Sequence, residues 1–260
     1  MPQTPVSSFR SKLKEWIHKA GGILAPPFEV CSYCRSHTRA QPNELGLCEA
    51  CFSQIPWIIN VECDRCGRAE QCPDCTRRQQ TYFVRNRSAV KYDTVMKDLL
   101  ALYKYRGDER LQTIFSTMLV HAFRLLLQSE KLSSEDFHCI TYVPVNEERL
   151  EERGFNQAER FATGLADKLR LPVRCTLIRT RNTPKQSFKS RQERLSDLQD
   201  AFALHPSVYN DPLWLDSPSQ RPIKIILVDD VYTTGSTLNQ CSRLLASYRN
   251  AQVYGLTWAR

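Results

Sequence analysis

The sequence has no apolar run long enough to cross a membrane. The longest apolar stretch of this 260-residue chain, residues 114–127, is interrupted by His121 and Arg124. Basic residues stand near the N-terminus, but no block of about 7–15 apolar residues follows them, so no signal peptide is expected. These two absences argue against a membrane-spanning or secreted protein, and they predict a cytoplasmic location.

Positive charge is concentrated in one segment. The chain has 36 basic and 28 acidic residues, a formal net charge of +8. Residues 149–194 alone hold twelve basic and five acidic side chains, a difference of +7. Such a segment attracts pyrophosphate or a nucleic-acid backbone. A solvated basic face on a stable domain has the same charge, so charge alone leaves both interpretations open.

Eight of the eleven cysteines form four Cys-x-x-Cys pairs: Cys31/Cys34, Cys48/Cys51, Cys63/Cys66 and Cys72/Cys75. One pair presents two thiolates to an ion, and a tetrahedral zinc site needs two pairs. In the sequential scheme the first two pairs share one ion and the last two share another. A cross-braced scheme also satisfies the spacings, but the sequential scheme is simpler.

Four thiolates leave no coordination position open, which predicts structural zinc ions rather than catalytic ones. A disulfide module would need an oxidising compartment, and no targeting signal indicates one. Because this segment has few aliphatic side chains, the metal should supply its folding energy. The isolated cysteines, Cys139, Cys175 and Cys241, are expected to be small core residues. The segment also mixes basic and aromatic side chains, as single-stranded nucleic acid would require: Trp57, Arg65, Arg68, Arg77, Arg78 and Tyr82.

Strand and helix patterns alternate after residue 81, which predicts an α/β domain with a mostly parallel sheet and helices on both faces. Strands are expected at residues 82–92, 138–145, 173–180, 201–204, 223–228 and 252–258. Helices are expected at residues 94–105, 108–129, 147–169, 191–199 and 236–248, and residues 9–20 form a short amphipathic helix at most. Residues 205–222 are rich in proline, serine and aspartate, and a loop is expected there.

Residues 223–238 carry the most informative pattern. An aliphatic run typical of a buried strand leads to Asp229 and Asp230, and a hydroxyl-rich loop then opens a helix. Backbone N–H groups in such a loop, and the helix N-terminus behind it, bind phosphate. The acid pair suits ribose hydroxyls or a Mg²⁺ ion held through water. The loop lacks the lysine of a P-loop, so nucleoside triphosphate hydrolysis is disfavoured. An ordinary βα turn with a Thr/Ser cap is the remaining alternative.

This segment resembles the 5-phosphoribosyl-1-pyrophosphate (PRPP) motif of type I phosphoribosyltransferases, over Val228-Asp229-Asp230-Val231-Tyr232-Thr233-Thr234-Gly235-Ser236-Thr237-Leu238. The resemblance implies that Asp229 and Asp230 are the catalytic acids, which hold the ribose hydroxyls and orient Mg²⁺-bound PRPP. It also implies that the 5-phosphate is bound by Thr233, Thr234, Gly235, Ser236 and Thr237.

Two further segments supply groups that suit this ligand. A strand ending near Val145 is followed by candidate pyrophosphate donors: Arg149, Arg153, Asn156 and Gln157. The alternative there is a helix in which Arg149 pairs with Glu148 or Glu152. Residues 179–191 are basic and weakly periodic, which favours a flexible loop that closes over a charged substrate, or a plain connecting loop. Its candidate ligand-binding residues are Lys185, Gln186, Lys189 and Arg191.

Taken in order, the cysteine pairs, Tyr103-Lys104-Tyr105-Arg106-Gly107-Asp108, Arg153-Gly154-Phe155-Asn156-Gln157 and the PRPP motif resemble the ComF family. That family joins a double zinc ribbon to a type I phosphoribosyltransferase-like domain and is associated with natural competence. The resemblance implies a segment at 1–27, a double zinc ribbon at 28–80 and a phosphoribosyltransferase-like domain at 81–260. Family members often carry Asn-Leu-x-Gly-Ala-Phe, where this chain has Asp197-Leu198-Gln199-Asp200-Ala201-Phe202.

The resemblance implies a phosphoribosyltransferase-like protein that binds PRPP with Mg²⁺, carries two structural zinc ions, and handles single-stranded DNA during uptake or processing. Other competence or DNA-processing proteins are expected partners. One alternative is a non-catalytic scaffold or sensor for single-stranded DNA on the same fold. A nucleotide-salvage phosphoribosyltransferase is a weaker alternative, because nothing between the strands identifies a base pocket.

Overall fold

The computed structural model describes residues 29–38, 43–106, 109–180, 201–215, 222–248 and 251–260. The chain divides into two compact units, Met1–Ser53 and Gln54–Arg260. The boundaries predicted after residues 27 and 80 stay predictions. No helix within the described ranges is both long enough and apolar enough to cross a bilayer.

The described part of the first unit contains a two-stranded antiparallel ladder and one short helix. β1 (Glu29–Val30) pairs with β2 (His37–Thr38), and α2 (Glu49–Phe52) starts directly after Cys48. In its described part only three side chains are buried: Cys31, Leu45 and Leu47. Such a small core needs a further source of stability.

The second unit is built on a four-stranded parallel sheet. Its strands, in spatial order, are β3 (Arg85–Val90), β8 (Gln252–Ala259), β7 (Lys224–Val231) and β4 (Cys139–Tyr142). Residues 225–228 of β7 are fully buried, as a strand covered on both faces requires.

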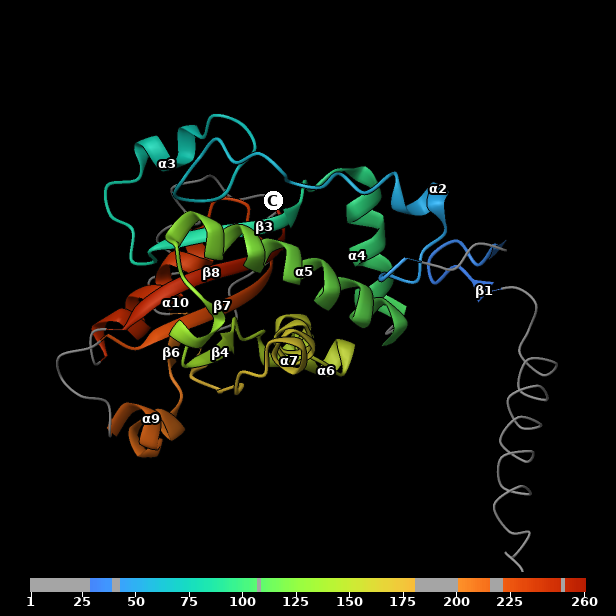
Figure 1. The fold of residues 1–260 in the computed structure, drawn as a ribbon. Helices are drawn as coiled ribbons and strands as arrows, with labels where there is room; N and C mark the ends of the chain where they lie inside the picture. Colours follow the sequence, from blue (N-terminus) through green and yellow to red (C-terminus); the bar gives the residue numbers. More distant parts are fainter. Residues whose placement is uncertain (1–28, 39–42, 107–108, 181–200, 216–221, 249–250) are drawn as a thin grey trace, which may run out of the picture. The chain divides into compact units, whose positions relative to one another are not determined.

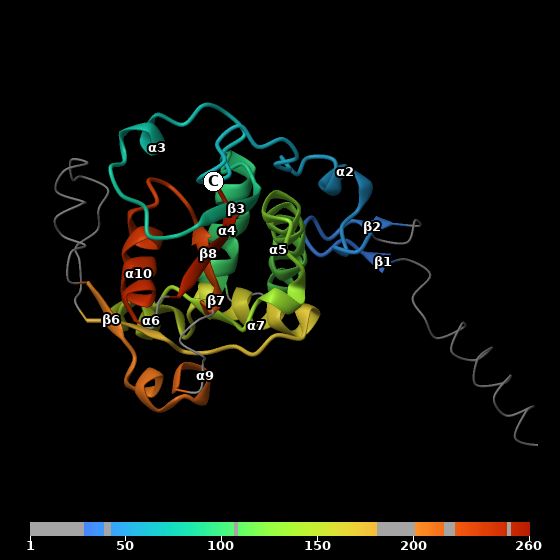
Figure 2. The same ribbon diagram turned by 60° about the vertical axis from the view of Figure 1, so that its left-hand side comes forward.

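Helices cover both faces of this sheet. α5 (Glu109–Glu130) and α7 (Gln157–Leu169) pack on one face, and α10 (Ser236–Ser247) packs on the other (Figures 1 and 2). α4 (Thr94–Arg106) precedes α5. The predicted α/β fold class is therefore confirmed. Two short helices lie outside these layers, α3 (Pro73–Arg77) and η1 (Ser134–Asp136).

The helix predicted at residues 147–169 is in fact two helices. α6 (Glu147–Arg153) ends at Gly154, whose φ of 75° lies in the left-handed region that glycine adopts without strain. Asn156 then caps α7 by accepting a hydrogen bond from the N–H of Ala158, at 3.0 Å. Nδ2 of Asn156 also donates to the carbonyl of Val143 at 3.1 Å, which joins the start of α7 to the residue after β4.

Other predictions were wrong in detail. The strands predicted at residues 173–180 and 201–204 form a separate antiparallel pair, β5 (Leu177–Arg179) with β6 (Phe202–Leu204). Part of the expected loop at 205–222 is helical, as η3 (Pro206–Asn210) and α9 (Pro212–Leu215), because each opens on a proline and α9 buries Trp214. Cys139 and Cys241 are buried as predicted, but Cys175 is exposed. The helices expected at 9–20 and 191–199 lie outside the described residues.

Candidate functional site

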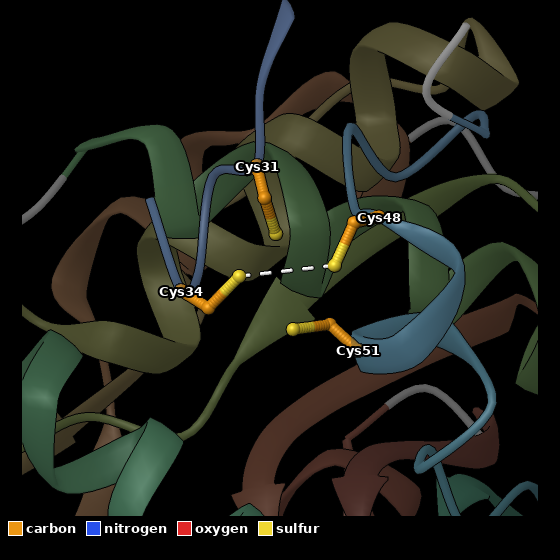
Figure 3. Close-up of side chains that lie close together, drawn as sticks. All are labelled: Cys31, Cys34, Cys48 and Cys51. Carbon is orange, nitrogen blue, oxygen red and sulfur yellow. Dashed lines mark hydrogen bonds between the residues drawn. The ribbon is translucent and has the colours of Figure 1, made fainter. Parts of the chain in front are cut away.

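The first cysteine cluster lies in the first unit. Cys31 and Cys34 come from the turn after β1, and Cys48 and Cys51 come from the start of α2. Their four sulfur atoms converge within 4.8 Å of one another, and the Sγ atoms of Cys34 and Cys48 are 3.7 Å apart (Figure 3). Zn–S bonds of about 2.3 Å give tetrahedral sulfur–sulfur edges of about 3.8 Å. The cluster therefore fits one zinc ion.

The second cluster lies in the second unit and groups Cys63, Cys66, Cys72 and Cys75 within the same 4.8 Å limit. The Sγ atoms of Cys66 and Cys72 are 3.6 Å apart. Both clusters follow the sequential scheme, and all eleven cysteines are free thiols. Four thiols at zinc-like spacing, with no disulfide, fit a closed structural site.

This second cluster is packed into the α/β unit. Cys66, Cys72 and Cys75 belong to the same buried cluster as Phe83 and residues of β7 and α10. The Nδ2 atom of Asn86, on β3, donates to the carbonyl of Cys66 at 3.0 Å. A zinc ion here would therefore stabilise the sheet as well as its own loop.

An acid pair stands at the carboxyl end of β7. The ammonium of Lys104, on α4, lies 2.5 Å from the Oδ2 atom of Asp230. Burial opposes ionisation of Asp230, but Lys104 outweighs it, so the pKa of Asp230 is lowered. Burial raises the pKa of Asp229 well above its ordinary value, and the charge of Asp230 adds to the rise. One carboxylate is thus held ionised beside one that resists ionisation.

These opposite shifts predict opposite effects of pH on stability. Because the folded chain holds the Asp229 proton more tightly than the unfolded chain, ionisation of Asp229 removes stability as pH rises above the ordinary pKa of 3.8. Asp229→Asn should therefore raise the free energy of unfolding near neutral pH by about 1 kcal/mol, and this gain should shrink below about pH 4. Urea unfolding across a pH series measures it.

Asp230→Asn is the matched control for this prediction. Asp230 has a lowered pKa, so its contribution to stability is present above 3.8 and disappears as pH falls through the lowered value. That substitution should destabilise the protein at neutral pH and leave Lys104 without its carboxylate partner. Two variants that shift stability in the same direction at neutral pH would contradict the assignment.

The loop after β7 is held by two arginines from distant parts of the chain. Arg78 donates to the carbonyls of Thr234 and Gly235, the latter at 3.1 Å. Arg260 donates to the carbonyls of Tyr232, at 3.3 Å, and Thr233, at 3.2 Å. Its Nη2 atom also lies 3.0 Å from the Sγ atom of Cys72, which links the loop to the second cysteine cluster.

With its carbonyls engaged, the loop keeps free N–H groups. Within the described residues, the N–H groups of Thr234, Gly235 and Thr237 have no hydrogen-bond acceptor. Gly235 has a φ of 72°, and a Cβ atom there would stand 2.0 Å from the hydroxyl oxygen of Tyr232. Glycine is thus required, and the loop with the N-terminus of α10 can bind an anion.

The segment that follows β4 lies beside the acid pair. Val143 donates to the carbonyl of Val228 at 3.0 Å, one residue before Asp229. Nη1 of Arg153 donates to Oε1 of Gln157 at 3.0 Å, and the charge of Arg153 contributes to the lowered pKa of Asp230. Arg153 and Gln157 therefore lie near the same edge of the sheet as the acid pair.

Individual donors differ in how they are used. Gln157 is 2% exposed, and its buried Nε2 atom has no hydrogen-bond partner in the described part of the chain. Asn156 donates to the carbonyl of Val143 at 3.1 Å and caps α7, so the chain itself uses both ends of its amide. Among the described ion pairs, none joins Arg149 to Glu148 or Glu152.

Sequence reasoning gave no role to Lys104 or Arg260, and it placed Arg78 only among the residues suited to single-stranded nucleic acid, because the partners of all three are distant in the chain. Lys104 belongs to the segment of residues 103–108, which resembles the ComF family, and this resemblance was the only indication in the sequence that Lys104 matters. The loop residues Lys185, Gln186, Lys189 and Arg191 lie outside the described residues. Of the basic and aromatic residues near the cysteines, Arg77, Arg78 and Tyr82 line one pocket, whereas Trp57 packs on His121 of α5 with ring centroids 5.1 Å apart.

A scan against protein-family models found no match. Competence protein ComFC of Bacillus subtilis is 33% identical over 230 residues, which cover 85% of this chain and 86% of that protein. Competence protein F of Haemophilus influenzae is 28% identical over 239 residues, 88% of this chain and 96% of that protein. DNA utilization protein YhgH of Escherichia coli is 27% identical over 222 residues, 83% of each chain.

Proposed function

Because this chain belongs to the ComF family, we propose that it binds PRPP with Mg²⁺ and transfers the phosphoribosyl group during the uptake or processing of DNA. The names of its relatives, which refer to competence and DNA utilization, support the cellular role. We place the protein in the cytoplasm, where the eight paired thiols stay reduced and free to bind zinc.

One observation carries the PRPP proposal. The loop of residues 232–235 has its four carbonyls held by Arg78 and Arg260, while the N–H groups of Thr234, Gly235 and Thr237 have no acceptor among the described residues. A phosphate is the anion that a loop and helix N-terminus of this kind accept. The acid pair immediately before the loop suits ribose hydroxyls, and the two features together match a phosphorylated ribose.

The neighbouring donors suit the leaving group. Arg153 brings a guanidinium and Gln157 brings an amide whose Nε2 atom has no partner among the described residues, and we assign Arg149 as a second guanidinium. In the proposed reaction, the bond from ribose C1 to pyrophosphate breaks and an acceptor nucleophile bonds to C1. Positive charge beside the pyrophosphate stabilises the negative charge that develops on it. Asn156 is assigned a positioning role, because its amide caps α7 and binds the carbonyl of Val143 and so holds the start of α7 in place.

The DNA part of the proposal is tested together with catalysis. The protein is incubated with PRPP and Mg²⁺, with and without a single-stranded oligonucleotide, and pyrophosphate is measured. Release that depends on the oligonucleotide supports a transferase that acts on DNA. PRPP binding without release would instead favour the non-catalytic sensor, and no PRPP binding at millimolar concentration would reject the proposal.

Arg260→Lys tests whether the loop must be held in its observed shape. Lysine keeps the charge but cannot donate to two carbonyls and a sulfur atom as the planar guanidinium does. The affinity for PRPP, measured by calorimetry, should fall by about tenfold, while two zinc ions remain bound. Arg124→Lys, at an exposed position on α5, is the matched control and should bind PRPP normally.

A further inference from the structure

A polar groove lies between the segment that leaves the second cysteine cluster and the exposed face of α10. Its volume is about 470 Å³, within the roughly 300–1,000 Å³ of sites that bury a small ligand. Residues 74–82 form one wall, and the first two turns of α10 form the other. Figure 2 shows the segment between α3 and β3 passing the start of α10.

Hydrogen bonds fix the two walls to each other. The N–H of Tyr82 donates to Oδ1 of Asn239 at 2.9 Å, and Nδ2 of Asn239 donates to the carbonyl of Gln80 at 3.3 Å. Arg78 joins the same wall to the loop before α10. The groove is therefore a preformed feature of this unit, which reduces the entropy lost when a ligand binds.

The lining has the chemistry of a nucleotide site. α10 buries its apolar face and turns Ser236, Gln240 and Arg243 towards the groove, and the facing wall carries Arg77 and Tyr82. Arginine on both walls suits a phosphodiester, and a tyrosine ring accepts any base by stacking. Amide side chains add donors and acceptors for base edges.

Charge in the groove favours an anion. Arg77, Arg78 and Arg243 line it, against the single carboxylate of Asp74. The groove also includes Thr234, from the loop after β7, and Ser236, the first residue of α10. Neither Asp229 nor Asp230 is among the described residues that line it. It is thus a separate space that meets the proposed PRPP site at the loop.

We propose that this groove binds single-stranded oligonucleotide, with a backbone phosphate between Arg77 and Arg243 and a base stacked on Tyr82. The inference rests on the proposed function, since it locates the DNA that a DNA-directed phosphoribosyltransferase must hold. A strand in the groove lies against the outer side of the phosphate loop and so presents its nucleotides next to the ribose site.

The test is fluorescence anisotropy with a labelled oligo-dT at several salt concentrations. Arg77→Ala and Arg243→Ala should each weaken binding roughly five- to tenfold and each lower the log–log salt slope by about 0.7. Tyr82→Ala should weaken binding about tenfold with an unchanged slope, and Tyr82→Phe should restore it. Asp74→Asn should strengthen binding. Arg124→Ala, on the opposite face of the sheet, is the control and should have no effect.

PRPP titrations on the same variants separate this inference from the proposed function. The affinity of the Arg243→Ala variant for PRPP should stay within about twofold of the parent, because Arg243 lies outside the ribose site. Parent-like DNA binding in both arginine variants would overturn the groove assignment and leave the PRPP proposal intact. Lost PRPP affinity with normal DNA binding would show that the groove belongs to the PRPP site. If the parent protein binds no oligonucleotide even at low salt, the groove assignment fails. The PRPP titration then tests the proposed PRPP site independently of DNA.

Discussion

Exchanging Asp229 and Asp230 together for asparagine should lower the affinity for PRPP in the presence of Mg²⁺ by about 100-fold or more. Each carboxylate is expected to accept a hydrogen bond from a ribose hydroxyl or from Mg²⁺-bound water. Hydrogen bonds to charged groups contribute about 1.5–3 kcal/mol each, so losing two reduces binding by at least two orders of magnitude. Isothermal titration calorimetry measures the change.

The fold should survive this exchange. Asparagine is nearly the same size as aspartate, and the double substitution removes the repulsion between two partly buried carboxyls. Thermal unfolding and zinc content should therefore stay close to those of the parent. Asp98→Asn combined with Asp167→Asn removes two exposed carboxylates of α4 and α7 and is the matched control. Unchanged PRPP affinity in the Asp229/Asp230 variant would refute the assignment of the acid pair.

Cys66→Ser should release one of two zinc ions and strongly destabilise the α/β unit. Cys66 is fully buried and packs in one cluster with residues of β7 and α10. Loss of a structural metal belongs with the changes that destabilise by about 4 kcal/mol or more. In a domain of this size that corresponds to a fall in Tm of roughly 8–16 °C.

Cys34→Ser provides the contrast, because Cys34 belongs to the first unit. It too should release one zinc ion, but the main unfolding transition of the second unit should keep its Tm. Cys175→Ser, at an exposed cysteine outside both clusters, should retain two zinc ions. Elemental analysis with calorimetric unfolding decides between these outcomes. Equal Tm shifts in the Cys34 and Cys66 variants would contradict the packing of the second cluster into the sheet.

Local patterns in the sequence were enough to predict most elements of the α/β fold. The continuous aliphatic run of β7 is typical of a buried strand, and the amphipathic pattern of α10 has the 3.6-residue period of a helix, so a short window reveals both. The cysteine pairs were equally accessible, because Cys-x-x-Cys spacing presents two thiolates to one ion, whereas the choice between the sequential and cross-braced schemes came from the structure. The division at Gly154 was missed, because it depends on a backbone turn at a left-handed glycine and not on a pattern of side chains.

The contacts that shape the candidate site could not be predicted. Arg78 and Arg260 bind carbonyls of residues 232–235 that are 157 and 28 residues away in the sequence. A pattern within a short window cannot predict contacts over such separations. The ion pair of Lys104 with Asp230 likewise depends on how α4 packs beside the end of β7. The exposure of Cys175 follows from its place before β5, where the chain leaves the parallel sheet.

The position of the 5-phosphate tests the central claim most directly. Crystals grown with PRPP and Mg²⁺ should show electron density for this phosphate at the N–H groups of Thr234, Gly235 and Thr237, with the ribose hydroxyls at Asp229 and Asp230. Phosphate density elsewhere on the protein, or none at millimolar PRPP in crystals where the loop is accessible, would contradict the account.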